Sequence, residues 1–123
     1  MERTTATSIF ESLASGTRLD IYRLLVRHTP AGLVAGEIGG TLGVPPTNLS
    51  FHLKALTQSG LLTVTPEGRY QRYRANLALM TELVAYLTAE CCQGNPGQCG
   101  ELAAVECRAD AQAAAATRRR SQR

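Results

Sequence analysis

The feature that most constrains the fold is a pair of short helical segments joined by a tight turn. Residues 35–43 carry apolar side chains four positions apart and end on Gly43, the residue type that closes helices in a left-handed conformation. The dipeptide Pro45-Pro46 then opens a second segment, because proline fits the first helical turn. Its apolar side chains recur at i, i+4 and i+7: Leu49, Leu53 and Leu56. We therefore predict helix-turn-helix spacing, with Val44 filling the turn.

Further periodic segments lie on both sides of this pair. Three- and four-residue apolar spacing predicts helices over 6–14, 17–28 and 77–91, and alternation between Leu62 and Tyr73 around Pro66-Glu67-Gly68 predicts a two-stranded wing. The predicted fold is mainly α (α+β), a winged helix-turn-helix of about five helices. A chain this small has little core left to cover the apolar face of 77–91, so we also predict a homodimer.

The length of the chain and its distribution of charge indicate how it is organised. Its 123 residues allow one domain, which excludes a two-domain cofactor enzyme. Residues 1–75 carry 8 basic and 5 acidic groups, 76–107 carry 0 and 4, and 108–123 carry 5 and 1, or +3, −4 and +4. We expect a DNA-binding and dimerisation domain over 1–92, a cysteine-bearing turn segment over 93–107 and a disordered basic tail over 108–123. With no apolar run long enough for a membrane span and no leader-like start, we expect a cytoplasmic protein.

The second helix of the pair has the composition of a helix that reads bases in a major groove. With its leucines turned inward, its small polar and basic side chains face outward, where asparagine can pair with adenine and phenylalanine can touch a thymine methyl. The candidates for contact with double-stranded DNA are Thr47, Asn48, Ser50, Phe51, His52 and Lys54. His52 borders the buried stripe, so a structural, hydrogen-bonded role is an equally good interpretation.

The wing adds cations close to this helix. Arg69, Gln71 and Arg72 are candidates for contact with phosphates or the minor groove. Any single arginine is as well explained as a solvated surface charge. The concentration of arginines on one hairpin after a helix-turn-helix favours DNA contact.

These motifs together resemble a known family. Residues 50–56 (Ser-Phe-His-Leu-Lys-Ala-Leu), 59–62 (Ser-Gly-Leu-Leu) and 67–74 (Glu-Gly-Arg-Tyr-Gln-Arg-Tyr-Arg) are similar to the pattern of the ArsR/SmtB winged-helix repressors, over about residues 9–92. The resemblance implies a homodimer that binds an inverted-repeat operator and releases it when metal binds. It does not specify the metal.

The chain lacks two ligand sets of that family. Residues 35–42 contain no cysteine, unlike the best-known arsenic sensors, and residues 77–91 contain neither the Asp nor the His ligands of the zinc sensors. What remains is Cys91-Cys92 followed by Cys99, which closely resembles the adjacent-cysteine-plus-one site of one type of arsenical-resistance repressor in the family.

The residues themselves favour the same site. Three soft thiolates suit As(III), and also Sb(III), better than they suit hard cations. Zinc is the rival, although it prefers four ligands and wider cysteine spacing. Cys107 could be a fourth ligand, which leaves its role open.

The function predicted is an arsenic-responsive repressor without an organic cofactor, and the alternative is a thiol redox sensor or a Zn/Cd sensor on the same fold. A small thiol enzyme is disfavoured, because no phosphate loop or arginine accompanies the cysteines.

Overall fold

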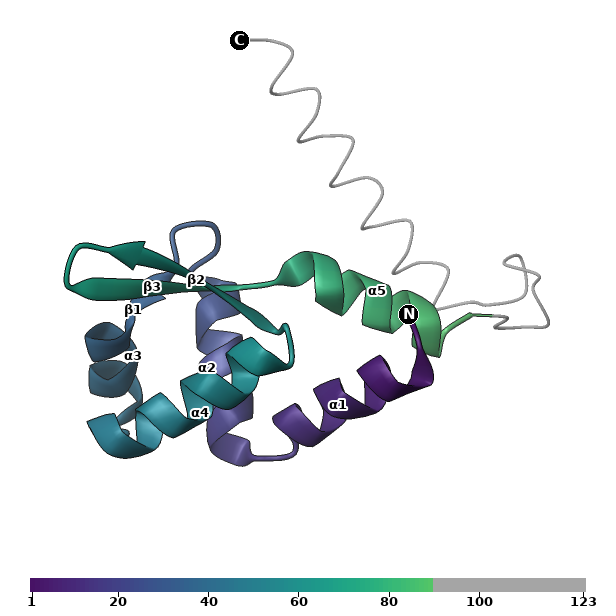
Figure 1. Cartoon of the computed structure of the whole chain (residues 1–123), viewed down its shortest axis with the longest axis horizontal. Helices are drawn as coiled ribbons and strands as arrows, with labels where there is room; N and C mark the ends of the chain where they lie inside the picture. Colours follow the sequence, from purple (N-terminus) through teal and green to yellow (C-terminus); the bar gives the residue numbers. More distant parts are fainter. Residues whose placement is uncertain (90–123) are drawn as a thin grey trace, which may run out of the picture. The chain divides into compact units, whose positions relative to one another are not determined.

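A computed structural model describes residues 1–89 of the chain (Figure 1). This part contains five helices and three strands: α1 (Arg3–Leu13), α2 (Gly16–Arg27), β1 (Leu33–Val34), α3 (Ala35–Leu42), α4 (Pro46–Gln58), β2 (Leu62–Glu67), β3 (Tyr70–Ala75) and α5 (Leu77–Leu87). Residues 1–86 form one compact unit, and a second unit begins at Leu87. The predicted winged helix-turn-helix class is confirmed. The expected boundaries at 92 and 107 lie outside the described residues.

The helix-turn-helix follows the predicted turn chemistry. Gly43 adopts φ +67°, the left-handed conformation that ends α3, and the Val44 N–H donates to the carbonyl of Gly39 at 3.1 Å. Val44 packs against the core, and Pro46 is the first residue of α4. The predictions for this turn are therefore confirmed.

The wing is larger than the sequence indicated. β2 and β3 pair antiparallel, and β1 adds a third strand in the order β1-β3-β2 by pairing Leu33 with Tyr73. A strand of two residues has no alternation to detect, which is why it was missed. The turn was predicted at Pro66-Glu67-Gly68, but Pro66 and Glu67 belong to β2. Glu67 pairs with Tyr70, so the turn consists of residues 68 and 69. Gly68 provides the φ of +59° that this turn needs.

The first two helices match their predicted ranges to within one residue, except at the start of α1. α1 begins at Arg3, three residues before the predicted start. At the predicted break, Ser15 caps α2 by accepting a hydrogen bond from the Arg18 N–H at 3.4 Å. Two apolar residues of α2, Leu19 and Val26, are exposed.

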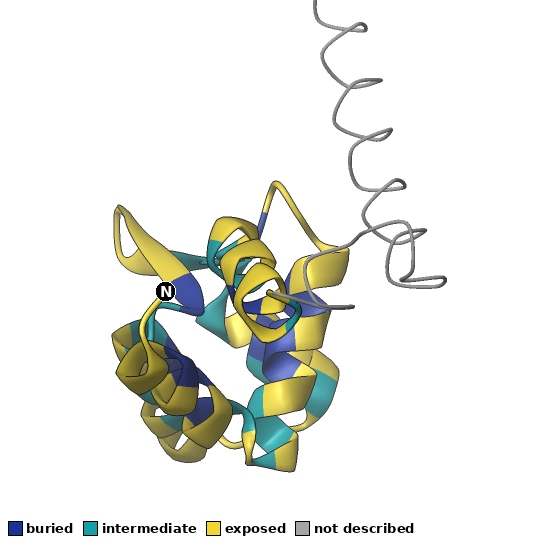
Figure 2. Ribbon diagram, turned by 90° about the vertical axis from the view of Figure 1, so that its right-hand side faces the viewer, coloured by how far each residue is buried: buried dark blue, intermediate teal, exposed yellow. Residues whose placement is uncertain are grey.

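One core lies where the inner faces of the elements meet (Figure 2). Its thirteen apolar members come from all five helices and from the α4–β2 junction: Ala6, Ile9, Ile21, Tyr22, Leu24, Leu25, Ile38, Leu49, Leu53, Leu56, Leu61, Leu62 and Leu83. The predicted leucine stripe of α4 is thus buried. This burial fixes which face of α4 points outward. Over residues 1–89, no helix is both long enough and apolar enough to span a membrane.

Candidate nucleic-acid interface

The outward face of α4 carries the predicted base-reading side chains. Leu49, Leu53 and Leu56 are 3%, 2% and 0% exposed, which anchors one side of the helix in the core. The opposite side exposes most of the predicted set to solvent, namely Thr47, Asn48, Ser50, Phe51 and Lys54. Phe51 is 65% exposed, far more than a side chain placed for packing within the chain. This helix presents polar, basic and apolar groups together on an open surface, as readout in a major groove requires.

A groove of about 670 Å³ runs between α4 and the wing. It is lined by Ser50 and Lys54 from the helix and by Arg69 and Gln71 from the hairpin. The structure thus brings four of the nine predicted DNA-contacting residues together from two separate elements. Neither Lys54 nor Arg69 forms an ion pair with another residue of the described part of the chain. Two uncompensated cations on facing walls make the groove attractive to a polyanion.

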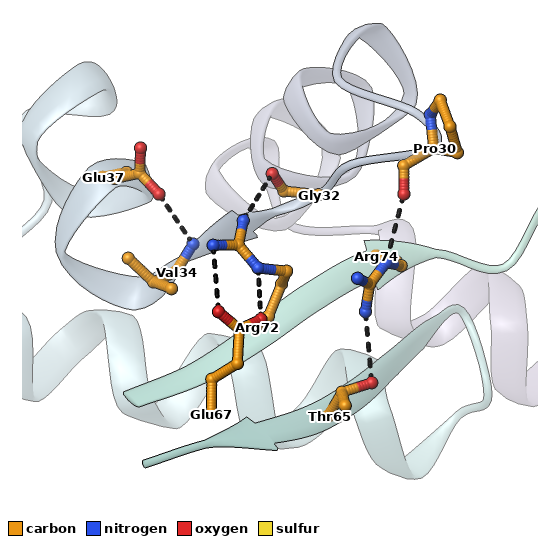
Figure 3. A network of polar contacts seen from close by, with 8 residues as sticks. All are labelled: Pro30, Gly32, Val34, Glu37, Thr65, Glu67, Arg72 and Arg74. Atoms are coloured by element: carbon orange, nitrogen blue, oxygen red, sulfur yellow. Dashed lines mark hydrogen bonds and ion pairs between the residues drawn. The ribbon is translucent and has the colours of Figure 1, made fainter. Parts of the chain in front are cut away.

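The second predicted wing cation, Arg72, already has partners within the chain. The guanidinium of Arg72 forms an ion pair with Glu67, with Nε and Oε2 at 2.5 Å, and also donates to the carbonyl of Gly32 at 3.2 Å (Figure 3). The hydrogen bond from Arg72 lowers the pKa of the Glu67 carboxyl, and the same bond raises the pKa of Arg72. Arg72 therefore braces the hairpin against the loop before β1. Its predicted contact with phosphate stays a prediction.

Arg74, which was not among the predicted contacts, braces the sheet in the same way. Its Nε donates to the carbonyl of Pro30 at 3.1 Å and its guanidinium also donates to Thr65 Oγ1 at 3.1 Å (Figure 3). In the same view, Glu37 accepts from the N–H of Val34 at 3.1 Å, which satisfies a backbone donor at the start of α3. Arg72 and Arg74 therefore tie the hairpin to the loop before β1, and neither side chain lines the groove.

His52 is half-buried, and its ring is engaged within the chain. Its Nδ1 accepts a hydrogen bond from Nε of Arg18 at 3.3 Å. This contact supports the structural interpretation of His52, although its predicted DNA contact is not tested by it. Arg18 itself was missed by sequence reasoning, because its partner is 34 positions away and no local pattern marks such a pair.

The predicted thiolate ligands Cys91, Cys92 and Cys99 lie outside the described residues, as does Cys107. Within residues 1–89, no three side chains of the His, Cys, Asp and Glu types come together as a metal site. Residues 1–89 therefore contain no such set of metal ligands. The predicted cysteine site stays a prediction.

Comparison with known proteins finds similarity to helix-turn-helix domains. A family model described as a helix-turn-helix domain matches residues 13–65, which include α2, α3 and α4. No curated protein sequence matches the chain significantly.

Solved structures match a larger part of the chain. An ArsR-like transcriptional regulator from Rhodococcus is 24% identical over 94% of this chain and 92% of its own, with a TM-score of 0.61. HlyU from Vibrio cholerae is 28% identical over 76% of this chain and 100% of its own, with a TM-score of 0.57. A solution structure from Mycobacterium bovis is described as the homodimeric winged helix-turn-helix DNA-binding domain of a possible ArsR-family regulator. It is 27% identical over 75% of this chain and 85% of its own, with a TM-score of 0.56.

Proposed function

We propose that this chain is a winged helix-turn-helix DNA-binding regulator of the ArsR family and not an enzyme, and that it acts as a cytoplasmic repressor that responds to arsenic. In this proposal a homodimer binds operator DNA and dissociates when As(III), or Sb(III), is bound by three cysteine thiolates. The ligands are Cys91, Cys92 and Cys99, as in arsenical-resistance repressors with adjacent cysteines.

The observation that carries the DNA-binding part is the groove between α4 and the wing. Lys54 and Arg69 both line it without internal ion pairs among the described residues, and α4 also exposes Asn48 and Phe51 to solvent. Cations position a protein on phosphates, while amide and apolar side chains discriminate bases. The two kinds of group lie next to each other here, as a sequence-specific DNA reader needs.

The inducer is inferred from the donor set. Three thiolates with no obligatory nitrogen or oxygen ligand match the preference of a soft, three-coordinate ion such as As(III). Residues 76–107 carry four acidic and no basic side chains, so this region does not compete for DNA phosphates. The dimeric state is supported by the Mycobacterium bovis domain, which is described as homodimeric.

Coupling between the two sites runs through α5 in this proposal. α5 ends at Leu87, four positions before Cys91, and it exposes Val84 and Leu87 as apolar surface for a second subunit. An ion bound just beyond α5 acts on the helix that joins the subunits, and so on the distance between two α4 helices in successive major grooves. The coupling is reciprocal, so operator DNA must weaken As(III) binding by the same factor.

An operator-release titration tests the proposal. The full chain is bound to a duplex selected from a random-sequence pool, and As(III), Sb(III), Cd(II), Zn(II) and peroxide are added separately. We expect release by As(III) and Sb(III). Release by Cd(II) or Zn(II) alone, or by peroxide with reversal by a dithiol, would select the metal-sensing or redox alternative instead.

Single cysteine variants then identify the ligands. We expect Cys91→Ser, Cys92→Ser and Cys99→Ser each to bind the duplex like the parent chain but to stay bound in arsenite. Cys107→Ser is the matched control and should be released like the parent. A variant of the first three that still releases DNA removes that residue from the site, and loss of release in the control adds Cys107 to it.

A further inference from the structure

Arg18 lies at the junction of three helices. It is near the start of α2, its Nε donates to Nδ1 of His52 on α4 at 3.3 Å, and its Nη1 donates to the carbonyl of Ser12 near the end of α1 at 3.2 Å. The hydroxyl of Ser12 in turn donates to the carbonyl of Ala55 on α4 at 3.5 Å. One guanidinium thus connects the last turn of α1 to the middle of α4.

The contact continues to the DNA-facing surface. The rings of His52 and Phe51 meet edge to face, with centroids 6.0 Å apart and planes at 73°. Phe51, a member of the predicted base-reading set, is 65% exposed. A path of direct contacts therefore leads from Ser12 through Arg18 and His52 to Phe51.

The direction of the hydrogen bond makes the imidazole an acceptor. A guanidinium can only donate, so Nδ1 of His52 accepts this bond through its lone pair. A second proton would remove the acceptor and place a cation against Arg18, the charged side chain that contacts the ring from α2. Within the described residues, the other groups hydrogen-bonded at this junction are neutral, namely the Ser12 hydroxyl and the carbonyls of Ser12 and Ala55.

We propose that Arg18 is a positioning residue for operator recognition, which fixes α4 and its Phe51 face relative to α1 by donating to neutral His52. The proposal rests on the DNA-binding function proposed above and adds a role that no local sequence motif carries. It also assigns His52 to the support of α4 and not to a contact with phosphate. The two roles predict opposite effects of protonating His52. A positioning histidine weakens DNA binding when it becomes charged, whereas a phosphate-contacting histidine strengthens it.

The test uses pH with matched histidine variants. The chain has two histidines, so His28→Asn leaves His52 as the only one. Affinity for the selected duplex is measured between about pH 7.5 and 5.5, the range in which imidazole ordinarily gains a proton. We expect the parent and His28→Asn to lose about tenfold or more in affinity on acidification, the scale of a lost charge-assisted hydrogen bond. His52→Asn, whose Oδ1 accepts from Arg18 at either pH, should show nearly the same affinity at both.

Arginine variants provide the second arm. Arg18→Ala should bind the duplex about tenfold more weakly at pH 7.5 and lose the pH dependence, on the same energetic scale. Arg23→Ala removes an equal charge from an exposed position of the same helix and should keep the parent's pH profile. Nitrogen NMR of the full chain without DNA should show His52 with a bare Nδ1 and a protonated Nε2, which reports the contact even if Arg18→Ala fails to fold.

The outcomes separate the two proposals. A parent chain that binds no duplex from the pool overturns the proposed function and this inference with it. If the parent chain binds DNA, three results would overturn only the proposed role of Arg18 and His52. The affinity of the parent for DNA does not fall on acidification, or the affinity of His52→Asn falls as much as that of the parent. The third result is an NMR spectrum that shows a protonated Nδ1 at pH 7.5.

Discussion

At the scale of single residues, the arginines of the wing differ in what their charge already contacts. Arg72 and Arg74 donate to backbone carbonyls and to Glu67 or Thr65, whereas Arg69 forms no hydrogen bond or ion pair with another residue in 1–89. A cation without a partner has its full charge available for phosphate, while a paired one must first give up its contacts. The sequence presents these three side chains as equivalent, and the fold distinguishes them.

The first prediction concerns that free charge. Arg69→Ala should weaken binding to every duplex sequence and reduce the slope of log K against log salt by about one, because one fewer counterion is released. The measurement is fluorescence anisotropy of a random-sequence duplex over a salt series. Arg27→Ala is the control, since it removes the same charge from an exposed position at the end of α2. Equal slopes for the two variants would remove Arg69 from the interface.

The second prediction concerns the pair that Arg72 makes. Because Arg72 lowers the pKa of Glu67 in the folded chain, the pair stabilises the fold above the ordinary carboxyl pKa of about 4.3. This contribution is lost as pH falls through the lowered pKa of the folded state. Glu67→Gln should therefore lower the urea midpoint slightly at neutral pH and not at all well below that range. A loss that persists in acid would show that packing, and not the ion pair, is responsible. The effect is small because both side chains reach solvent.

At the scale of elements, α3 combines a well-defined end with a weak interior. Gly43 ends it in the left-handed region, where a side chain is strained, and Gly40 lies in the helix with nothing within 4 Å of where a methyl group would be. Glycine inside a helix is unfavourable by about 1 kcal/mol relative to alanine. Gly43 is therefore required by the backbone conformation, whereas Gly40, three residues earlier, is not.

Alanine at these two positions should have opposite effects. Gly43→Ala should destabilise the chain by about 1–2 kcal/mol, because alanine is strained at positive φ. Gly40→Ala should stabilise it by up to about 1 kcal/mol through helix propensity. Urea denaturation followed by circular dichroism measures both. Destabilisation by Gly40→Ala would mean that the open space seen next to it is filled in solution.

The sequence predicted those elements that have their own local signal. The turn before α4 has a glycine and two prolines, and the leucine stripe of α4 has helical spacing, so both were placed correctly. The strand β1 has two residues and depends on β3, about 40 positions later, so it has no periodicity to detect. The outward residues of α4 followed from the position of its buried face. The contact of Arg18 with His52 and the contact of Arg72 with Gly32 did not, because each joins groups that are distant in the chain.

At the scale of the whole molecule, apolar side chains on two helices of the described domain reach the surface. Phe10 on α1 and Val84 on α5 are each 46% exposed, and Leu87 is 56% exposed. Exposed apolar groups of this size on helices are typical of interfaces between subunits. Phe51 is more exposed than Phe10, but it lies on the α4 face assigned to DNA. An exposed apolar side chain in this domain can therefore belong to a subunit interface or to the DNA-binding face. Measuring the oligomeric state of variants distinguishes the two.

The last prediction separates them. Val84→Lys should raise the dissociation constant of the dimer by about a hundredfold or more, because an unpaired charge is costly in an apolar contact. Sedimentation equilibrium of the full chain measures this constant. Operator affinity should fall with it, since two α4 helices must be held one helical turn apart, about 34–36 Å, to occupy both half-sites. Phe51→Ala should leave the dimer intact and weaken only the binding of DNA. If Val84→Lys remains dimeric, the subunits meet through a surface other than this face of α5, and the route proposed from the cysteines to the DNA loses its central element.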